Sequence, residues 1–241
     1  MAINLDTADQ SKTVTKAKFG RKGQLFEVFV FLFLIVPSLV LSFFVVQQGT
    51  LSFVLVAIST ILRDLALVSL ILFFLWRNGE SVKSLGWTFK HGWREVILGI
   101  GLFIPLTFGA AWLEQFLQLA GFSVPSTPQP SFLTATDTAQ FILAFVLVVV
   151  VAVTEETIFR GYLILRLGAI TASQTVAVLA SAVIFSLGHG YEGTAGVVTV
   201  GVLGLVFALV YVWRKSLVAP IVMHFLQDFI GIILLPLLGL R

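Results

Sequence analysis

Long apolar runs follow one another along almost the whole chain, with only short polar stretches between them. A helix needs about 20 apolar residues to cross the hydrocarbon core of a bilayer. Seven runs reach about this length, which predicts an all-α fold: a polytopic transmembrane helical bundle. Arg63 and Asp64 interrupt the second run, and a break there would give eight membrane segments. The predicted spans are 26–47, 53–76, 95–117, 139–165, 172–190, 194–213 and 217–239.

The composition agrees with a membrane protein. Of 241 residues, 58% are hydrophobic and 11% are charged, whereas a soluble domain carries about 25% charged residues. The mean hydropathy is +1.04. The absence of cysteine excludes disulfides, thiolate metal sites and a cysteine nucleophile. The net charge of +3 does not indicate a nucleic-acid partner, and the lipid bilayer is the expected surrounding.

The polar and apolar segments divide the chain into two predicted parts. Residues 1–24 are rich in lysine and arginine and lack the layout of a signal peptide. We interpret them as a disordered cytoplasmic tail, with a polybasic segment that touches lipid as the alternative. Residues 25–241 form the predicted membrane-embedded helical domain.

Basic residues occur at alternate connections between the predicted spans. They lie in the N-terminal tail, after the second span, at the end of the fourth and after the sixth, and the intervening loops have none. Because cytoplasmic loops are enriched in lysine and arginine, we predict a cytoplasmic N-terminus and an external C-terminus. The proline-containing loop 118–138 is then external, as a connector or as a lid.

Two adjacent glutamates, Glu155 and Glu156, stand inside an apolar stretch. A charged residue at bilayer depth costs about 2.5–3.5 kcal/mol on insertion scales, and such residues mark functional sites. Neighbouring helical residues point about 100° apart, whereas residues four apart share a face. We therefore predict that Glu156 pairs with Arg160, while Glu155 faces a cavity and is free for chemistry. A structural carboxylate bonded to a neighbouring helix is the alternative for Glu155.

Two of the three histidines also lie in apolar stretches. Phe185 and His189 are four residues apart, as are His224 and Asp228, so each pair shares a helical face. Considered singly, His189 is better explained by a polar cap, and His224 is explained equally well by a structural His–Asp hydrogen bond. However, intramembrane polar groups pair with one another because unpaired burial is costly. We therefore expect these two segments and the segment of Glu155 to converge on one cavity.

The three motifs, in this order and spacing, resemble the CPBP family, also called Abi, of CAAX proteases and bacteriocin-processing or immunity proteins. Gly161 and the stretch Ser84-Leu85-Gly86 add to the similarity. The resemblance covers about residues 150–230. It implies an intramembrane endopeptidase that acts on a membrane-associated protein or peptide substrate.

The resemblance also implies a role for each motif residue. The prenyl-protein proteases of the family commonly have asparagine where this chain has Asp228. An ionised carboxylate cannot donate a hydrogen bond, so Asp228 is either protonated or orients His224. The implied roles are water activation by Glu155 and His189, support by Glu156, Arg160 and Phe185, and oxyanion stabilisation by His224 and residue 228.

A zinc site is the alternative mechanism. Glu155, His189 and His224 would supply a His₂Glu ligand set, but the chain has no His-Glu-x-x-His motif, and a metal-independent glutamate mechanism without a cofactor is favoured.

One difficulty is depth: counted along the predicted spans, Glu155 lies about 16 Å and His224 about 10 Å from the cytoplasmic helix ends, but His189 about 27 Å. Either the fifth span starts deeper or tilts strongly, or Gly188 and Gly190 permit a break.

Two other classes of function compete with a protease: a membrane scaffold or bacteriocin-immunity protein that keeps the fold, and a transporter. The intact motif residues argue against lost chemistry. Transporters often have repeated halves, whereas the ionisable groups here cluster mainly in the C-terminal half. Arg63, Asp64 and Glu114 lie outside the motifs and are interpreted as structural pairs within the bundle, with a place on the substrate path as the alternative.

Overall fold

The computed structural model describes residues 20–44, 51–89, 92–125 and 133–240. Residues 1–19, which make up most of the predicted tail, lie outside these ranges, as does part of the loop 118–138. The first helix begins at Arg21, so the last residues of the predicted tail are helical. Within the described ranges the chain contains helices and no strand, which confirms the all-α fold.

The described chain consists of helices of very different lengths joined by short connections. Two stretches are π-helices, which follow directly on α-helices, and two short connections contain 3₁₀ turns. The elements are α1 (Arg21–Ser42), α2 (Phe53–Asn78), η2 (Val82–Leu85), α3 (Trp93–Leu119), α4 (Thr138–Glu155), η4 (Glu156–Leu163), α5 (Ile164–Thr171), α6 (Gln174–Leu187), η5 (Gly190–Glu192), α7 (Gly193–Arg214), α8 (Val218–Asp228), η6 (Phe229–Leu234) and α9 (Leu235–Leu237).

Six helical stretches in the described residues are long and apolar enough to cross a membrane: 21–42, 53–78, 93–119, 138–171, 190–214 and 218–237. They correspond to six of the seven predicted spans and confirm a polytopic bundle. The remaining prediction, 172–190, corresponds to α6, which has 14 residues and extends about 21 Å. Helix α2 runs unbroken through Arg63 and Asp64, so the second span is not split.

Side chains at the helix termini explain several of these boundaries. Ser52, Asp137 and Ser173 precede α2, α4 and α6, and each accepts a hydrogen bond from a backbone N–H in the first turn. Such N-caps satisfy donors that a helix leaves unpaired. Gly79 ends α2 in the left-handed conformation, which glycine adopts without steric cost.

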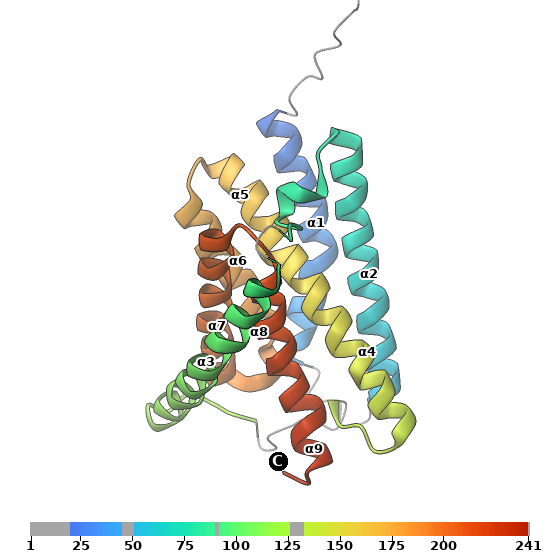
Figure 1. Cartoon of the computed structure of the whole chain (residues 1–241), viewed down its shortest axis with the longest axis vertical. Coiled ribbons are helices and arrows are strands. Elements are labelled where there is room, and N and C mark those ends of the chain that lie inside the picture. The colour runs from blue at the N-terminus through green and yellow to red at the C-terminus, as the bar shows by residue number, and fades with distance from the viewer. Residues whose placement is uncertain (1–19, 45–50, 90–91, 126–132, 241) are drawn as a thin grey trace, which may run out of the picture.

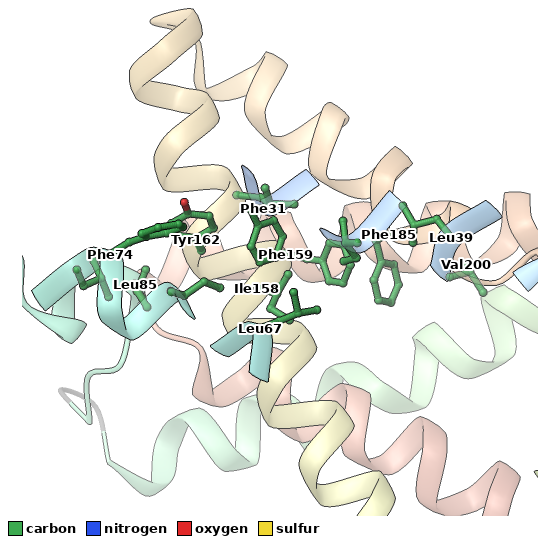
Figure 2. Packing of buried hydrophobic residues seen from close by; sticks show 14 residues of the cluster. Phe31, Leu39, Leu67, Phe74, Leu85, Ile158, Phe159, Tyr162, Phe185 and Val200 are labelled. Carbon is green, nitrogen blue, oxygen red and sulfur yellow. The ribbon is translucent and has the colours of Figure 1, made fainter. Parts of the chain in front are cut away.

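The continuous run α4–η4–α5 crosses the centre of the bundle and is the element around which the others pack (Figure 1). Helix α2 packs against α4, α6 lies between α5 and α7, and α8 contacts both α3 and α4. The largest apolar cluster surrounds η4 and contains residues of α1, α2 and α6 (Figure 2). It includes Phe31, Phe74 and Tyr162. The ring centroid of Tyr162 lies 5.3 Å from that of Phe31 and 6.3 Å from that of Phe74.

Gly161 lets η2 approach the central helix. A Cβ atom added at Gly161 would lie 2.9 Å from the carbonyl oxygen and 3.1 Å from the Cβ of Leu85. Leu85 is completely buried and belongs to the central cluster. The two glycine-containing stretches noted in the sequence, at 84–86 and at 161, are therefore the two sides of one close contact.

We predict that Gly161→Ala lowers the free energy of unfolding by about 1–3 kcal/mol, because the added methyl group meets backbone that cannot move aside cheaply. Gly101→Ala is the matched control, because a Cβ there has nothing within 4 Å and alanine favours a helix by up to about 1 kcal/mol. Melting temperatures in detergent would compare the two. Equal melting temperatures would contradict a tight contact at Gly161.

Candidate active site

The motif residues surround one cavity of about 180 Å³ between α1, α2, α4, α6 and α8. Its lining includes Glu155, His189, His224 and Asp228, together with Phe185. These residues come from three stretches of sequence, and the outermost two, Glu155 and Asp228, are 73 positions apart. The predicted convergence on one cavity is therefore present in the fold.

Glu155 is the last residue of α4 and faces this cavity with a side chain that is 14% exposed. Its Oε1 atom lies 4.0 Å from Nη2 of Arg63, and its Oε2 atom lies 3.9 Å from Nε2 of His224. Both separations exceed hydrogen-bond length. The carboxylate thus has cationic or polar neighbours but keeps its lone pairs directed to the cavity.

Glu156 points away from the cavity and is fully buried. Its Oε1 atom accepts hydrogen bonds from Nη1 of Arg160 at 2.8 Å and from Nδ1 of His224 at 2.9 Å. The Glu156–Arg160 contact is the one that the four-residue spacing predicts. The contact with His224 is a tertiary one that sequence spacing does not indicate, and it ties α8 to the central helix.

Arg160 is buried against two other helices. Its Nη2 atom donates to the carbonyl of Gly204 at 3.2 Å. Its guanidinium lies over the rings of Phe185 and Phe207, at 4.2 and 5.2 Å from the centroids. A Cβ at Gly204 would lie 2.9 Å from Phe185, so glycine is what admits the guanidinium beside α7. Cation–π contacts of a desolvated arginine contribute about 2 kcal/mol.

Both π-helices begin directly after a motif residue. The chain changes from α to π geometry between Glu155 and Glu156, and again after Asp228. A π-turn widens a helix by one residue, and such turns are frequent at functional sites. Regular α-helical spacing, on which the predicted helix faces depend, gives no sign of these segments.

The depth of His189 is explained by a break in the chain, one of the alternatives considered above. Helix α6 ends at Leu187, and His189 lies in the turn that leads through η5 into α7. Ser42 at the end of α1 holds this turn: its hydroxyl donates to the carbonyl of Leu187 at 3.0 Å and accepts from the N–H of Gly190 at 3.2 Å. His189 therefore lines the same cavity as Glu155 without a full-length fifth span.

The two histidines present their Nε2 atoms differently. Nδ1 of His189 lies 3.2 Å from the carbonyl of Phe185. A carbonyl only accepts, so Nδ1 carries the hydrogen and Nε2 of the neutral ring is an acceptor. Nδ1 of His224 is bonded to Glu156, and its Nε2 atom lies 3.4 Å from Oδ2 of Asp228. Nε2 of His224 therefore lies between the carboxylates of Asp228 and Glu155, at 3.4 and 3.9 Å.

Arg63 and Asp64, which lie outside the three motifs, also line the cavity. Asp64 is 1% exposed and accepts from Nε of Arg63 at 2.9 Å and from the hydroxyl of Thr154 at 3.2 Å. The pair is structural, as expected, but it forms the wall next to Glu155. The sequence does not predict this position beside Glu155, because α2 contacts α4 only in the tertiary fold. The one sign of it in the sequence is a charged pair within an apolar run.

Glu114 lies in α3, apart from this cavity. It lines a second cavity of about 440 Å³ between α3, α7 and α8. That cavity shares His189, His224 and Asp228 with the first. The two cavities therefore meet along the histidine side of the site.

The described residues contain no group of three or more histidine, cysteine, aspartate or glutamate side chains arranged to hold a metal ion. Glu155, His189 and His224 remain the residues that would supply zinc ligands. In the present arrangement, Nδ1 of His224 is already bonded to Glu156, so only Nε2 faces the cavity.

Residues 137–230 match the family model described as Rce1-like, type II CAAX prenyl endopeptidase Rce1-like. Over this segment the chain is similar to that family. The match contains all three motifs and confirms the resemblance inferred from them. No curated protein and no solved structure matched the chain. Helices α1, α2 and α3 lie outside the matched segment.

We predict that Glu156→Ala costs about 3–5 kcal/mol of stability, because it leaves Arg160 buried without its carboxylate. Glu155→Ala is the matched control, because Glu155 makes no hydrogen bond with the described residues. We expect its replacement to leave the fold intact. Thermal unfolding in detergent would measure both. Similar melting temperatures for the two variants would contradict the conclusion that the ion pair between Glu156 and Arg160 stabilises the fold.

Proposed function

We propose that the chain is an intramembrane endopeptidase in which Glu155 and His189 activate water for attack on a peptide bond. The observation that carries this proposal is the arrangement of Glu155, His189, His224 and Asp228 around one cavity inside an apolar bundle. The Rce1-like match over residues 137–230 supports the same reaction class.

The geometry suits amide hydrolysis. Glu155 has lone pairs directed to the cavity, so its carboxylate takes a proton from the attacking water. His189 presents Nε2 as an acceptor and orients the same water. The proton held by Glu155 then passes to the leaving amine, as the peptide C–N bond breaks.

The opposite side of the cavity supplies the donor for the oxyanion. Nε2–H of His224 is held between Asp228 and Glu155, at 3.4 and 3.9 Å. A positioned donor that meets developing negative charge contributes roughly 3–4 kcal/mol to transition-state stabilisation. We assign the donation to His224 and an orienting role to Asp228, because an ionised carboxylate has no hydrogen to give.

We expect purified protein to cleave a membrane peptide from a panel of prenylated and unprenylated sequences, and Glu155→Gln to abolish that cleavage. A zinc chelator should leave the wild-type rate unchanged, because the proposed mechanism uses no metal ion. Chelator-sensitive cleavage that zinc restores would favour the His₂Glu metal site. Full activity of Glu155→Gln would exclude Glu155 as the base, and His189→Gln tests the second water contact in the same assay.

We expect Asp228→Asn to lower kcat roughly tenfold, which corresponds to about 1.4 kcal/mol, because the charge that orients His224 is lost while the side-chain shape is kept. Steady-state kinetics with folded protein would measure this change. Unchanged activity would instead indicate that residue 228 works as a neutral hydrogen-bond donor, as asparagine does.

A further inference from the structure

The charges at the two ends of the bundle are strongly unequal. Of the ten lysine and arginine residues that the structure describes, two lie midway along the bundle: Arg63 beside the cavity and Arg160 in the interior. The other eight lie at the end where α1 begins, α2 ends and α5 is joined to α6, which we call the basic end; they are Arg21, Lys22, Arg77, Lys83, Arg94, Arg166, Arg214 and Lys215.

The other end has no described lysine or arginine. It comprises the end of α1, the start of α2 and α4, the turn between α6 and α7, and the C-terminal helix α9 (Figure 1). Its described connections carry acidic side chains instead, at Asp137 and Glu192. Because lysine and arginine are retained on the cytoplasmic side of membrane proteins, this distribution assigns the basic end to the cytoplasm.

The cavity lies in the half of the bundle away from the basic end. It is lined by the last turns of α1, the first half of α2 and the middle of the continuous helical span 218–237. It reaches Leu133 and Tyr191, in two connections of the acidic end. None of its lining residues belongs to the connections at the basic end, 79–92, 172–173 and 215–217.

A packed layer separates the cavity from the basic end. On α1, α2 and η4, the buried aromatic residues nearer that end are Phe31, Phe74 and Tyr162, which pack on one another and do not line the cavity (Figure 2). Beyond them, Glu27 is fully buried between Arg77 at 2.7 Å and Arg166 at 3.2 Å. Close-packed apolar side chains and buried ion pairs leave no polar path for a peptide.

We propose that the active-site cavity is entered from the extracytoplasmic side of the membrane. The substrate class is then a membrane-anchored peptide whose scissile bond lies in the extracytoplasmic half of the bilayer, and not a segment delivered from the cytoplasm. The assignment of this substrate class rests on the proposed peptidase function. The direction of access rests only on the charges and on the position of the cavity.

The chain contains no cysteine, so single cysteines report the side of access without background. Ser84→Cys probes an exposed residue at the basic end, Thr138→Cys an exposed residue at the acidic end, and Thr60→Cys the cavity wall. Ile58→Cys is the matched control for Thr60, because it lies on the same helix but is exposed outside the cavity. The probe is a membrane-impermeant methanethiosulfonate, applied to intact cells and to permeabilised membranes.

We expect Thr138→Cys and Thr60→Cys to react fully in intact cells, and Ser84→Cys to react only after permeabilisation. Ile58→Cys should react in neither sample, because a thiol that faces lipid does not ionise to the reactive thiolate. Reaction of Ser84→Cys in intact cells would overturn the orientation. Reaction of Thr60→Cys only after permeabilisation would overturn the direction of access. The readout requires no enzymatic activity, so failure of the peptidase assay and failure of this proposal are distinguishable.

Discussion

The site depends on one buried carboxylate. A single oxygen of Glu156 accepts hydrogen bonds from both Arg160 and His224, and the side chain is fully buried. Burying an ion costs several kcal/mol unless partners compensate for the lost hydration. Through Arg160 this carboxylate holds the central helix against α6 and α7, and through His224 it holds α8. Because Glu156 makes these structural contacts, the carboxylate of the adjacent Glu155 is left to face the cavity.

The second constraint is a break in the helical backbone at membrane depth. Non-helical backbone is tolerated there only where protein covers it or where it lines a cavity. Ser42 bonds to both sides of the turn at His189, and Phe43 packs so closely on Gly190 that a Cβ there would lie 2.4 Å from its ring. The end of α1 thus replaces the hydrogen bonds that a continued helix would have made. A shorter α6 brings His189 to the level of Glu155.

The Rce1-like segment does not contain the whole cavity. Residues 137–230 supply the motif residues, while α1 and α2 complete the wall with Ser38, Arg63 and Asp64. The Arg63–Asp64 pair places a cation 4.0 Å from Glu155 and is anchored to α4 through Thr154. The electrostatic surroundings of the proposed base are therefore set partly by helices that lie outside the matched segment.

Hydropathy and residue spacing were sufficient to predict the all-α membrane bundle, six of its spans, the pairing of Glu156 with Arg160 and the three motifs, because each is a local property of length or helical periodicity. The turn at His189 was one of the alternatives that the depth of this residue raised. The short α6, the π-turns after Glu155 and Asp228, the bond from His224 to Glu156 and the position of Arg63 beside Glu155 were not predicted. Each of these depends on which helices become neighbours. That choice is made by side-chain packing and by the pairing of buried charges between segments distant in the chain, and one-dimensional periodicity contains no information about it.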